Sequence, residues 1–342
     1  MISDVEKQTG ALFGSLWTSL SDEQYRDSVE LFTKRAIINN FDLGWLKGKK
    51  CLDAGCGSGR YSVAMALHGA GSITAVDVSE TGLAGAKHRA AEFPQIQFQH
   101  ASILDLPFED ASFDFVWSAG VIHHTSDFDK ALYELTRVLR PGGKLFLLVY
   151  GVGGLRWKAI KALRPIVVDL GIELLDKAIT AAGLSANNRK HFMDDLFVPI
   201  QKLTSMNELS LKLSALGFKD IDRWTGETYD HESNPSAQLE DILKLQRIAA
   251  ASAQYATTAT EHYLAQLARD TATRYVETTC KAIADHSLSE QEIRDIVIGE
   301  SNLRVLATKY GAGPAVRAAT GRAAPAPIPV RHPEGAPEIR TV

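Results

Sequence analysis

Three glycines alternate with other residues in the stretch Asp53-Ala-Gly55-Cys-Gly57-Ser-Gly59-Arg60, between a short apolar run and a helical pattern. Glycine lacks a Cβ, so the backbone can approach a ligand closely, and the helix start that follows presents free N–H groups. This order of strand, glycine-rich turn and helix is typical of nucleotide-binding sites. The dinucleotide fingerprint G-x-G-x-x-G would need a glycine where this chain has Arg60. The spacing therefore favours a nucleotide ligand and disfavours a dinucleotide.

A second acid follows the next expected strand, because the run 72–76 ends at Asp77, 24 residues after Asp53. With that acid, the glycine turn resembles motif I of the class I S-adenosylmethionine-dependent methyltransferases. Further segments are similar to later motifs of the same family, in the same order: Leu104-Asp-Leu-Pro-Phe108, Ser112 to Ser118 and Arg137 to Leu145. The resemblance covers roughly residues 41 to 151.

The resemblance implies S-adenosyl-L-methionine as the cofactor and assigns residues to it. Asp77 would accept hydrogen bonds from both ribose hydroxyls, a contact that suits a carboxylate. Arg60 would either approach the methionine carboxylate of the cofactor or remain an exposed residue of the first helical turn. The predicted cofactor-binding residues are Asp53, Gly55, Cys56, Gly57, Gly59, Arg60, Asp77, Val78, Ser102, Ile103 and Ser118.

One segment departs from the family pattern. Many relatives carry Gly-Asp before the Leu-Pro-Phe turn, and that carboxylate accepts from the adenine amino group. This chain has Ala101-Ser102 there. Ser102 can form a hydrogen bond, but only as a neutral group, so the resemblance leaves the adenine contact less defined than the ribose contact.

The segment expected to face the reacting methyl group contains His123 and His124. Imidazole titrates near neutral pH, so both are candidate general bases. Adjacent residues on a helix point about 100° apart, so we expect one of them at most to face the acceptor. Tyr150 is a second candidate for the pocket, with a half-buried aromatic at the sheet edge as the alternative. Asp194-Asp195 is either a loop that closes over the pocket or a solvated acidic turn.

Composition agrees with an ordinary cytoplasmic enzyme. The chain has 342 residues, more than a single hydrophobic core usually contains, so we expect a main domain with an appendage. Hydrophobic residues make up 45% of the chain, which is ample for a buried core. The net charge of −4 gives no support for a nucleic-acid partner. We expect no membrane partner either, because neither a signal peptide nor a run of 18 apolar residues is present. The cysteines Cys51, Cys56 and Cys280 lack metal or disulfide spacing, and we expect small buried side chains without a metal.

Short β-rich runs alternate with helical patterns between residues 49 and 150, which predicts an α/β fold. We expect a Rossmann-like doubly wound sheet, mostly parallel with an antiparallel last strand, carrying a helical insert and a helical C-terminal appendage. The expected units are a helical cap at 1–40, an adenosylmethionine-binding core at 41–150, a helical insert or lid at 151–204, a sheet-closing helix and strands at 205–234, the helical appendage at 235–310 and a disordered tail at 311–342.

The resemblance implies methyl transfer to a small-molecule acceptor. Within the family, the chain resembles methyltransferases of bacterial biosynthetic gene clusters, which implies O- or N-methylation of a natural product, sugar or metabolite. One alternative is a non-catalytic adenosylmethionine-binding protein with an assembly role. The other is a nicotinamide-dependent oxidoreductase, which Arg60 disfavours. The apolar helices of the insert or the appendage are candidates for a homodimer interface.

Overall fold

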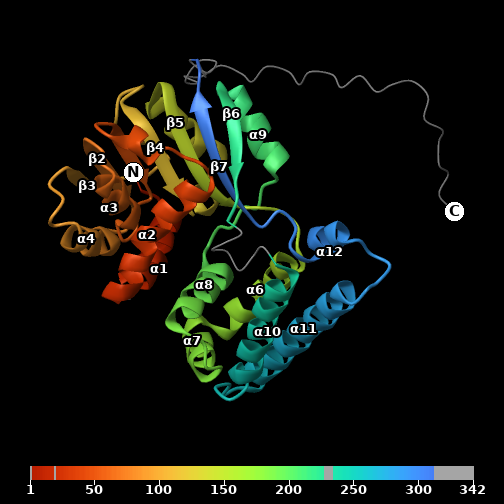
Figure 1. Cartoon of the computed structure of the whole chain (residues 1–342). Coiled ribbons are helices and arrows are strands. Elements are labelled where there is room, and N and C mark those ends of the chain that lie inside the picture. The colour runs from red at the N-terminus through yellow and green to blue at the C-terminus, as the bar shows by residue number, and fades with distance from the viewer. Residues whose placement is uncertain (1, 19–20, 227–233, 312–342) are drawn as a thin grey trace, which may run out of the picture.

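The computed structural model describes residues 2–18, 21–226 and 234–311. They form two lobes, an α/β lobe built on a twisted sheet and a lobe made of helices, joined side by side (Figure 1). The first lobe contains most of the N-terminal half of the chain and also two strands from the C-terminal half.

Within the described residues the α/β lobe has one seven-stranded sheet in the order β3-β2-β1-β4-β5-β7-β6. Strands β1 to β5 pair in parallel, while β7 pairs antiparallel to both of its neighbours. This confirms the predicted Rossmann-like sheet with an antiparallel last strand. The strands are β1 (Lys50–Ala54), β2 (Ser72–Asp77), β3 (Ile96–His100), β4 (Phe113–Ala119), β5 (Leu139–Tyr150), β6 (Phe218–Trp224) and β7 (Asn302–Lys309).

Helices cover both faces of this sheet, so the central strand β4 is buried along nearly its whole length. In β4 Phe115 and Trp117 enter one core and Val116, between them, enters the other. Phe113 also enters the second core, and the pairing register of the strand shifts between Phe113 and Phe115. Trp117 stacks on Phe146 of β5 with ring centroids 3.6 Å apart. The covering elements are α2 (Asp22–Ile38), η1 (Leu43–Leu46), α3 (Arg60–Leu67) and α4 (Glu80–Arg89) toward the first core, and η2 (Ile122–His124), α5 (Phe128–Val138) and α9 (Met206–Ala215) toward the second.

The amphipathic helix α5 shows how the sequence specifies this packing. Phe128, Ala131, Leu132 and Leu135 fall on one face and are all buried in the second core. Asp127 caps the helix by accepting from the backbone N–H of Lys130. The next strand, β5, begins directly at the end of this helix.

The helical lobe joins segments far apart in sequence. Its helices are α6 (Leu155–Leu170), α7 (Ile172–Ala181), α8 (Ala186–Phe197), α10 (Pro235–Ser252), α11 (Ala259–Ile283) and α12 (Glu290–Val297). Helices α6, α7, α8, α10 and α11 share one core. Ala265, Ala268 and Ala272 of α11 are fully buried in the structure, and small side chains let this helix lie close to its neighbours. The predicted insert and appendage therefore form a single lobe.

Two expected boundaries are corrected by the sheet. Both closing strands were expected in residues 205–234, but among the described residues of that range only β6 is a strand. The second, β7, lies within the predicted appendage, and its side chains at Leu303, Val305 and Ala307 enter the second core. Residues 302–309 thus insert between β5 and β6 after the chain has completed the helical lobe. The predicted disordered tail at 311–342 lies outside the described residues except for Gly311.

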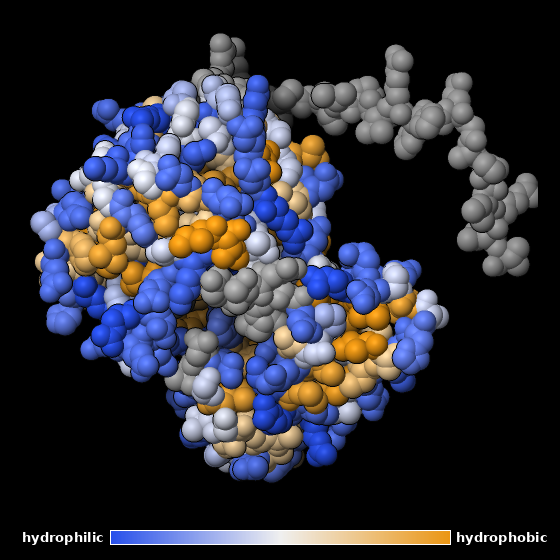
Figure 2. Space-filling view, in the orientation of Figure 1, coloured by the Kyte–Doolittle hydropathy of each residue, from blue (hydrophilic) through white to orange (hydrophobic). Residues whose placement is uncertain are grey.

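The surface shown in Figure 2 is mostly polar, with hydrophobic residues gathered in patches on both lobes. Exposed apolar side chains on the helical lobe include Val168, Leu243 and Tyr263. In the part of the chain that the structure describes, no helix is both long enough and apolar enough to cross a membrane. Cys51 and Cys56 are buried as expected, whereas Cys280 is exposed on α11, which corrects that prediction.

Candidate active site

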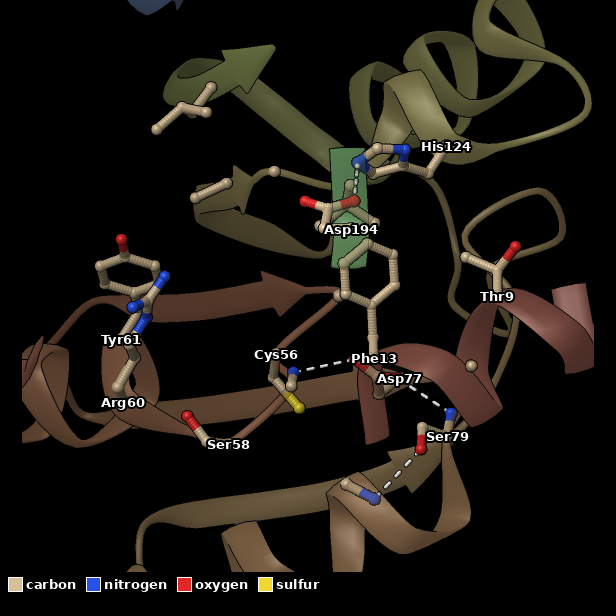
Figure 3. Close-up of a pocket in the computed structure, with 18 of the residues that line it drawn as sticks. Thr9, Phe13, Cys56, Ser58, Arg60, Tyr61, Asp77, Ser79, His124 and Asp194 are labelled. Atoms are coloured by element: carbon tan, nitrogen blue, oxygen red, sulfur yellow. Dashed lines mark hydrogen bonds and ion pairs between the residues drawn. The ribbon is translucent and has the colours of Figure 1, made fainter. Parts of the chain in front are cut away.

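A cavity of about 620 Å³ opens at the edge of the sheet where the parallel strands end. This edge is where α/β sheets bind ligands, and the volume lies in the usual range for a small-molecule site. Strand ends, the helices α1 (Asp4–Thr18) and α2, and the helical lobe all contribute to its wall. Figure 3 shows Asp77 and Cys56 near one end of it, Asp194 and His124 near the other, and Phe13 between them.

The glycine-rich turn between β1 and α3 is held by the end of β2. The backbone N–H groups of Gly55 and Cys56 donate to the carbonyl of Val76, at 2.8 and 2.9 Å. Gly55 has φ +81°, and a Cβ there would lie within 2.5 Å of a methyl carbon of Val121. This position therefore requires glycine for two reasons: its φ angle is positive, and the loop that follows β4, which contains Val121, lies too close for a side chain.

Asp77 ends β2 and faces the cavity. Its two carboxylate oxygens accept from the backbone N–H groups of Gly57 and Ser79, each at 2.8 Å. Burial raises the pKa of this carboxyl, and these backbone donors act in the opposite direction. A carboxylate has about four acceptor sites, so the two backbone bonds leave capacity for two hydroxyl donors.

The structure brings most of the predicted cofactor residues to the cavity wall. Those lining it are Gly55, Cys56, Gly57, Arg60, Asp77, Val78 and Ile103. The Arg60 guanidinium lies over the Tyr61 ring, 4.5 Å from its centroid, at the same end of the cavity.

Four predicted cofactor residues do not line the cavity. Asp53 is buried beneath the turn and accepts from the Ser62 hydroxyl at 2.6 Å, and burial raises its pKa to about 7. Ser118 donates to the carbonyl of Ala54. A Cβ on Gly59 would point toward Ala86 and Phe98, away from the cavity. These three residues therefore contribute to the packing of the turn against the protein interior and not to the cavity wall.

Ser102, the fourth, contacts a side chain that the sequence did not indicate as part of the site. Its hydroxyl donates to Glu6 of α1 and accepts from the backbone N–H of Leu104. Glu6 itself lines the cavity.

At the other end of the cavity, His124 meets Tyr150 and Asp194. The Tyr150 hydroxyl donates to the Asp194 carboxyl at 2.8 Å, and His124 Nε2 lies 3.7 Å from the other oxygen of that carboxyl. His124 Nδ1 is 2.9 Å from the carbonyl of Ile200. Since a carbonyl only accepts, Nδ1 carries the proton, and in the neutral ring Nε2 has a free lone pair.

Burial sets the protonation of this cluster. It lowers the pKa of His124 to about 4 and, together with the neighbouring charge of Asp195, raises the pKa of Asp194 to about 8. Both groups are therefore uncharged near neutral pH. Asp194 lies in helix α8 with its side chain 14% exposed, and Asp195 is buried, so the acidic pair is neither a loop nor a solvated turn.

His123 does not line the cavity. Its side chain is fully buried against Tyr150, with ring centroids 4.1 Å apart. Among the described residues neither of its ring nitrogens has a hydrogen-bond partner, and burial holds its pKa well below the usual value. The two adjacent histidines thus face different surroundings, and only His124 faces the cavity.

The position of α8 depends on a buried ion network in the helical lobe. Arg156 of α6 donates to Asp195 of α8 at 2.5 Å and to Asp241 of α10 at 3.1 Å. Arg164 donates to the carbonyls of Asp195 and Val198 at the end of α8. These contacts fix the helix that carries Asp194.

Sequence reasoning missed the wall supplied by the N-terminal helices and by the C-terminal half. The additional lining residues include Glu6, Thr9, Gly10, Phe13 and Gly14 of α1, Arg35 of α2, Arg156 and Trp157 of α6, and Asn302 and Arg304 of β7. The one available signal was Gly10 and Gly14, four residues apart in a helical segment, which indicates a face in close contact. Within the described ranges, His, Cys, Asp and Glu side chains form no cluster that could hold a metal ion.

Comparison with known proteins identifies the core. Residues 52–147 match the family model described as "Methyltransferase domain". A demethylmenaquinone methyltransferase of Staphylococcus aureus (strain MRSA252) is 38% identical over 109 residues, which are 31% of this chain and 45% of the relative, and the enzyme of strain JH9 matches equally. The chain thus spans less than half the length of these curated relatives.

Solved structures with a similar arrangement include the [4+2]-cyclase SpnF, with a TM-score of 0.44, 20% identity, and coverage of 82% of this chain and 80% of that one. A phosphoethanolamine N-methyltransferase 2 from Haemonchus contortus gives a TM-score of 0.47, 18% identity, and coverage of 91% and 60%. The family match lies on the segment that forms the glycine turn, the Asp77 strand and the His124 segment. Within the α/β core, residues 52–147 therefore form a methyltransferase domain.

Proposed function

We propose that the protein transfers a methyl group from S-adenosylmethionine to a small-molecule acceptor. The observation that carries this proposal is one cavity with a nucleoside-binding turn at one end and a buried His124–Tyr150–Asp194 cluster at the other. The cofactor would supply an electrophilic methyl group on a sulfonium sulfur.

The residues at the first end fit this cofactor. Asp77 retains acceptor capacity for two ribose hydroxyls, and the glycine turn leaves the backbone open to the ligand. Arg60 offers a guanidinium to the methionine carboxylate, and such charge-assisted contacts favour arginine.

The residues at the second end would align the acceptor and receive its proton. His124 Nε2 is a neutral base whose other nitrogen is held by the carbonyl of Ile200. A neutral hydroxyl or amine loses a proton when it is methylated, and a base within hydrogen-bond reach can take it. Because His124 and Asp194 are both uncharged near neutral pH, this end suits an uncharged acceptor group.

Two measurements test the proposal. Calorimetry should show binding of S-adenosylmethionine and its demethylated product S-adenosylhomocysteine, but not of NAD. Labelled S-adenosylmethionine should then transfer its methyl group to a member of an acceptor panel, in which demethylmenaquinone is included because the S. aureus relatives bear that name. Binding of NAD instead would favour an oxidoreductase. Binding of the cofactor without turnover on any acceptor, or on extracts of small molecules, would favour a non-catalytic protein.

A further inference from the structure

The first turn of α1 places a carboxylate at the cavity wall. Glu6 is largely buried, with 9% of the residue exposed. One of its oxygens accepts from the Ser102 hydroxyl, and the other accepts from the backbone N–H and the hydroxyl of Ser3, each at 2.8 Å. The oxygen that faces Ser102 uses one of its two lone pairs in this contact.

Ser102 orients this carboxylate. Its hydroxyl has a single hydrogen, which it donates to Glu6, and it accepts from the backbone N–H of Leu104 at 3.1 Å. Burial raises the pKa of Glu6, but the hydrogen bonds from Ser102 and Ser3 outweigh this effect and lower it. Near neutral pH, Glu6 is therefore an ionised group that only accepts hydrogen bonds.

Close backbone packing holds α1 against the end of β2. A Cβ on Gly10 would lie 3.2 Å from a methyl carbon of Val78 and 3.3 Å from its backbone. A Cβ on Gly14 would overlap the Ser79 hydroxyl. The helix can thus sit directly on the two residues that follow Asp77, and this contact fixes the position of Glu6.

The strand order indicates which part of a nucleoside would meet Glu6. A ribose at Asp77 lies at the end of β2, with β1 and β4 on one side and β3 on the other. The His124 cluster lies on the β4 side, so the reacting end of the ligand must extend that way. The base must then extend toward the end of β3, where Ala101, Ile103 and Glu6 line the wall.

We propose that Glu6 recognises the adenine base, by accepting a hydrogen bond from its exocyclic amino group, and that Ser102 is the positioning residue for Glu6. This inference rests on the proposed function, because it assumes an adenosyl ligand. It gives the acceptor role in adenine recognition to a helix that lies outside the matched domain, 96 residues before Ser102.

The test compares two ligands that differ only at the recognised group: S-adenosylhomocysteine and its 6-deamino analogue, in which purine replaces adenine. The Glu6 carboxylate can accept from the amino group of the first ligand, whereas the second ligand has no donor at that position. A hydrogen bond to a charged group corresponds to a preference of roughly 10- to 150-fold in Kd. We therefore expect calorimetry on the wild-type chain to show a preference for the adenine ligand of that order.

Three variants test whether Glu6 causes that preference. Glu6→Ala should reduce it to less than about 3-fold, and Glu6→Gln should reduce it in part, because a neutral amide oxygen accepts a weaker hydrogen bond than a carboxylate does. Asp4→Asn is the matched control, since Asp4 lies in the same helical turn with its side chain 90% exposed, and it should retain the wild-type preference. Equal melting temperatures of Glu6→Gln and the control would exclude loss of α1 as the cause.

The outcomes are distinguishable. If the wild-type chain binds both ligands equally, or if Glu6→Ala and Glu6→Gln keep the preference, another group recognises the base and the inference is wrong. If the wild-type chain binds neither ligand while folded, the proposed cofactor itself is wrong, which is a separate result.

Discussion

His124 is the most informative residue to change, because its neighbour His123 provides a control at the adjacent position. In His124→Gln the side-chain amide can still donate to the carbonyl of Ile200, but the variant has no basic nitrogen toward the cavity. General base catalysis contributes about 10²–10⁴ in rate. We expect kcat to fall by that factor, equivalent to about 2.7–5.5 kcal/mol in the barrier, while the affinity for S-adenosylhomocysteine stays within about 3-fold.

The control is His123→Phe, which keeps an aromatic ring against Tyr150 and removes two ring nitrogens that have no hydrogen-bond partner among the described residues. This variant should retain kcat within a few fold, because His123 does not line the cavity. Both variants are measured with the same labelled-methyl assay and the same calorimetric titration.

The pH profile provides a second readout. Only the neutral ring accepts a proton, and burial lowers the pKa of His124 to about 4. The rate should therefore rise with pH around 4 and be flat between about pH 5.5 and 7, whereas an exposed imidazole would give a rise near pH 6.5. If His124→Gln remains almost fully active, the reasoning is refuted and transfer proceeds by alignment of the acceptor alone, which itself supplies much of the rate.

Three further changes test other parts of the site. Asp77→Ala should weaken S-adenosylmethionine binding by about 1.5–3 kcal/mol in calorimetry, and unchanged affinity in a folded variant would reject the ribose contact. Arg156→Leu leaves Asp195 and Asp241 as buried charges without this partner, so chemical denaturation should show a loss of about 3–5 kcal/mol; a loss under 1 kcal/mol would mean the network does not hold the lobe. The folded-state pKa of Asp194 is raised from 3.8 to about 8, so the wild-type chain loses stability from this group as pH rises from about 4 to 8. Asp194→Asn should lack that loss, and melting temperatures should show its advantage over wild type growing across this range; a constant difference would contradict the assignment.

The sequence predicted the cofactor end of the site because its signals are local. The glycine turn follows β1 and Asp77 ends β2, and parallel strands bring their ends to one edge of a sheet. The same pattern did not show that Asp53 and Ser118 would turn inward, because strand alternation alone does not say which polar group finds a partner within the protein.

The sequence did not predict the burial of Asp194 and Asp195, since two adjacent acids usually lie in solvent. Their burial depends on partners elsewhere: Tyr150 ends β5, and Arg156 starts the next helix. Strand β7 was missed for a related reason. Its residues follow a long helical segment, and only the gap between β5 and β6 gives them a partner on each side.

The family match covers the cofactor end of the cavity and only a small part of the other end. Residues 52–147 contain the glycine turn and Asp77 and, of the cluster at the other end of the cavity, only His124. Tyr150, Trp157 and Asp194, which line the acceptor end, all lie beyond that stretch. Since an acceptor is recognised by the groups that surround it, its identity depends on the helical lobe, and changes in that lobe should alter the choice of acceptor while leaving cofactor affinity intact.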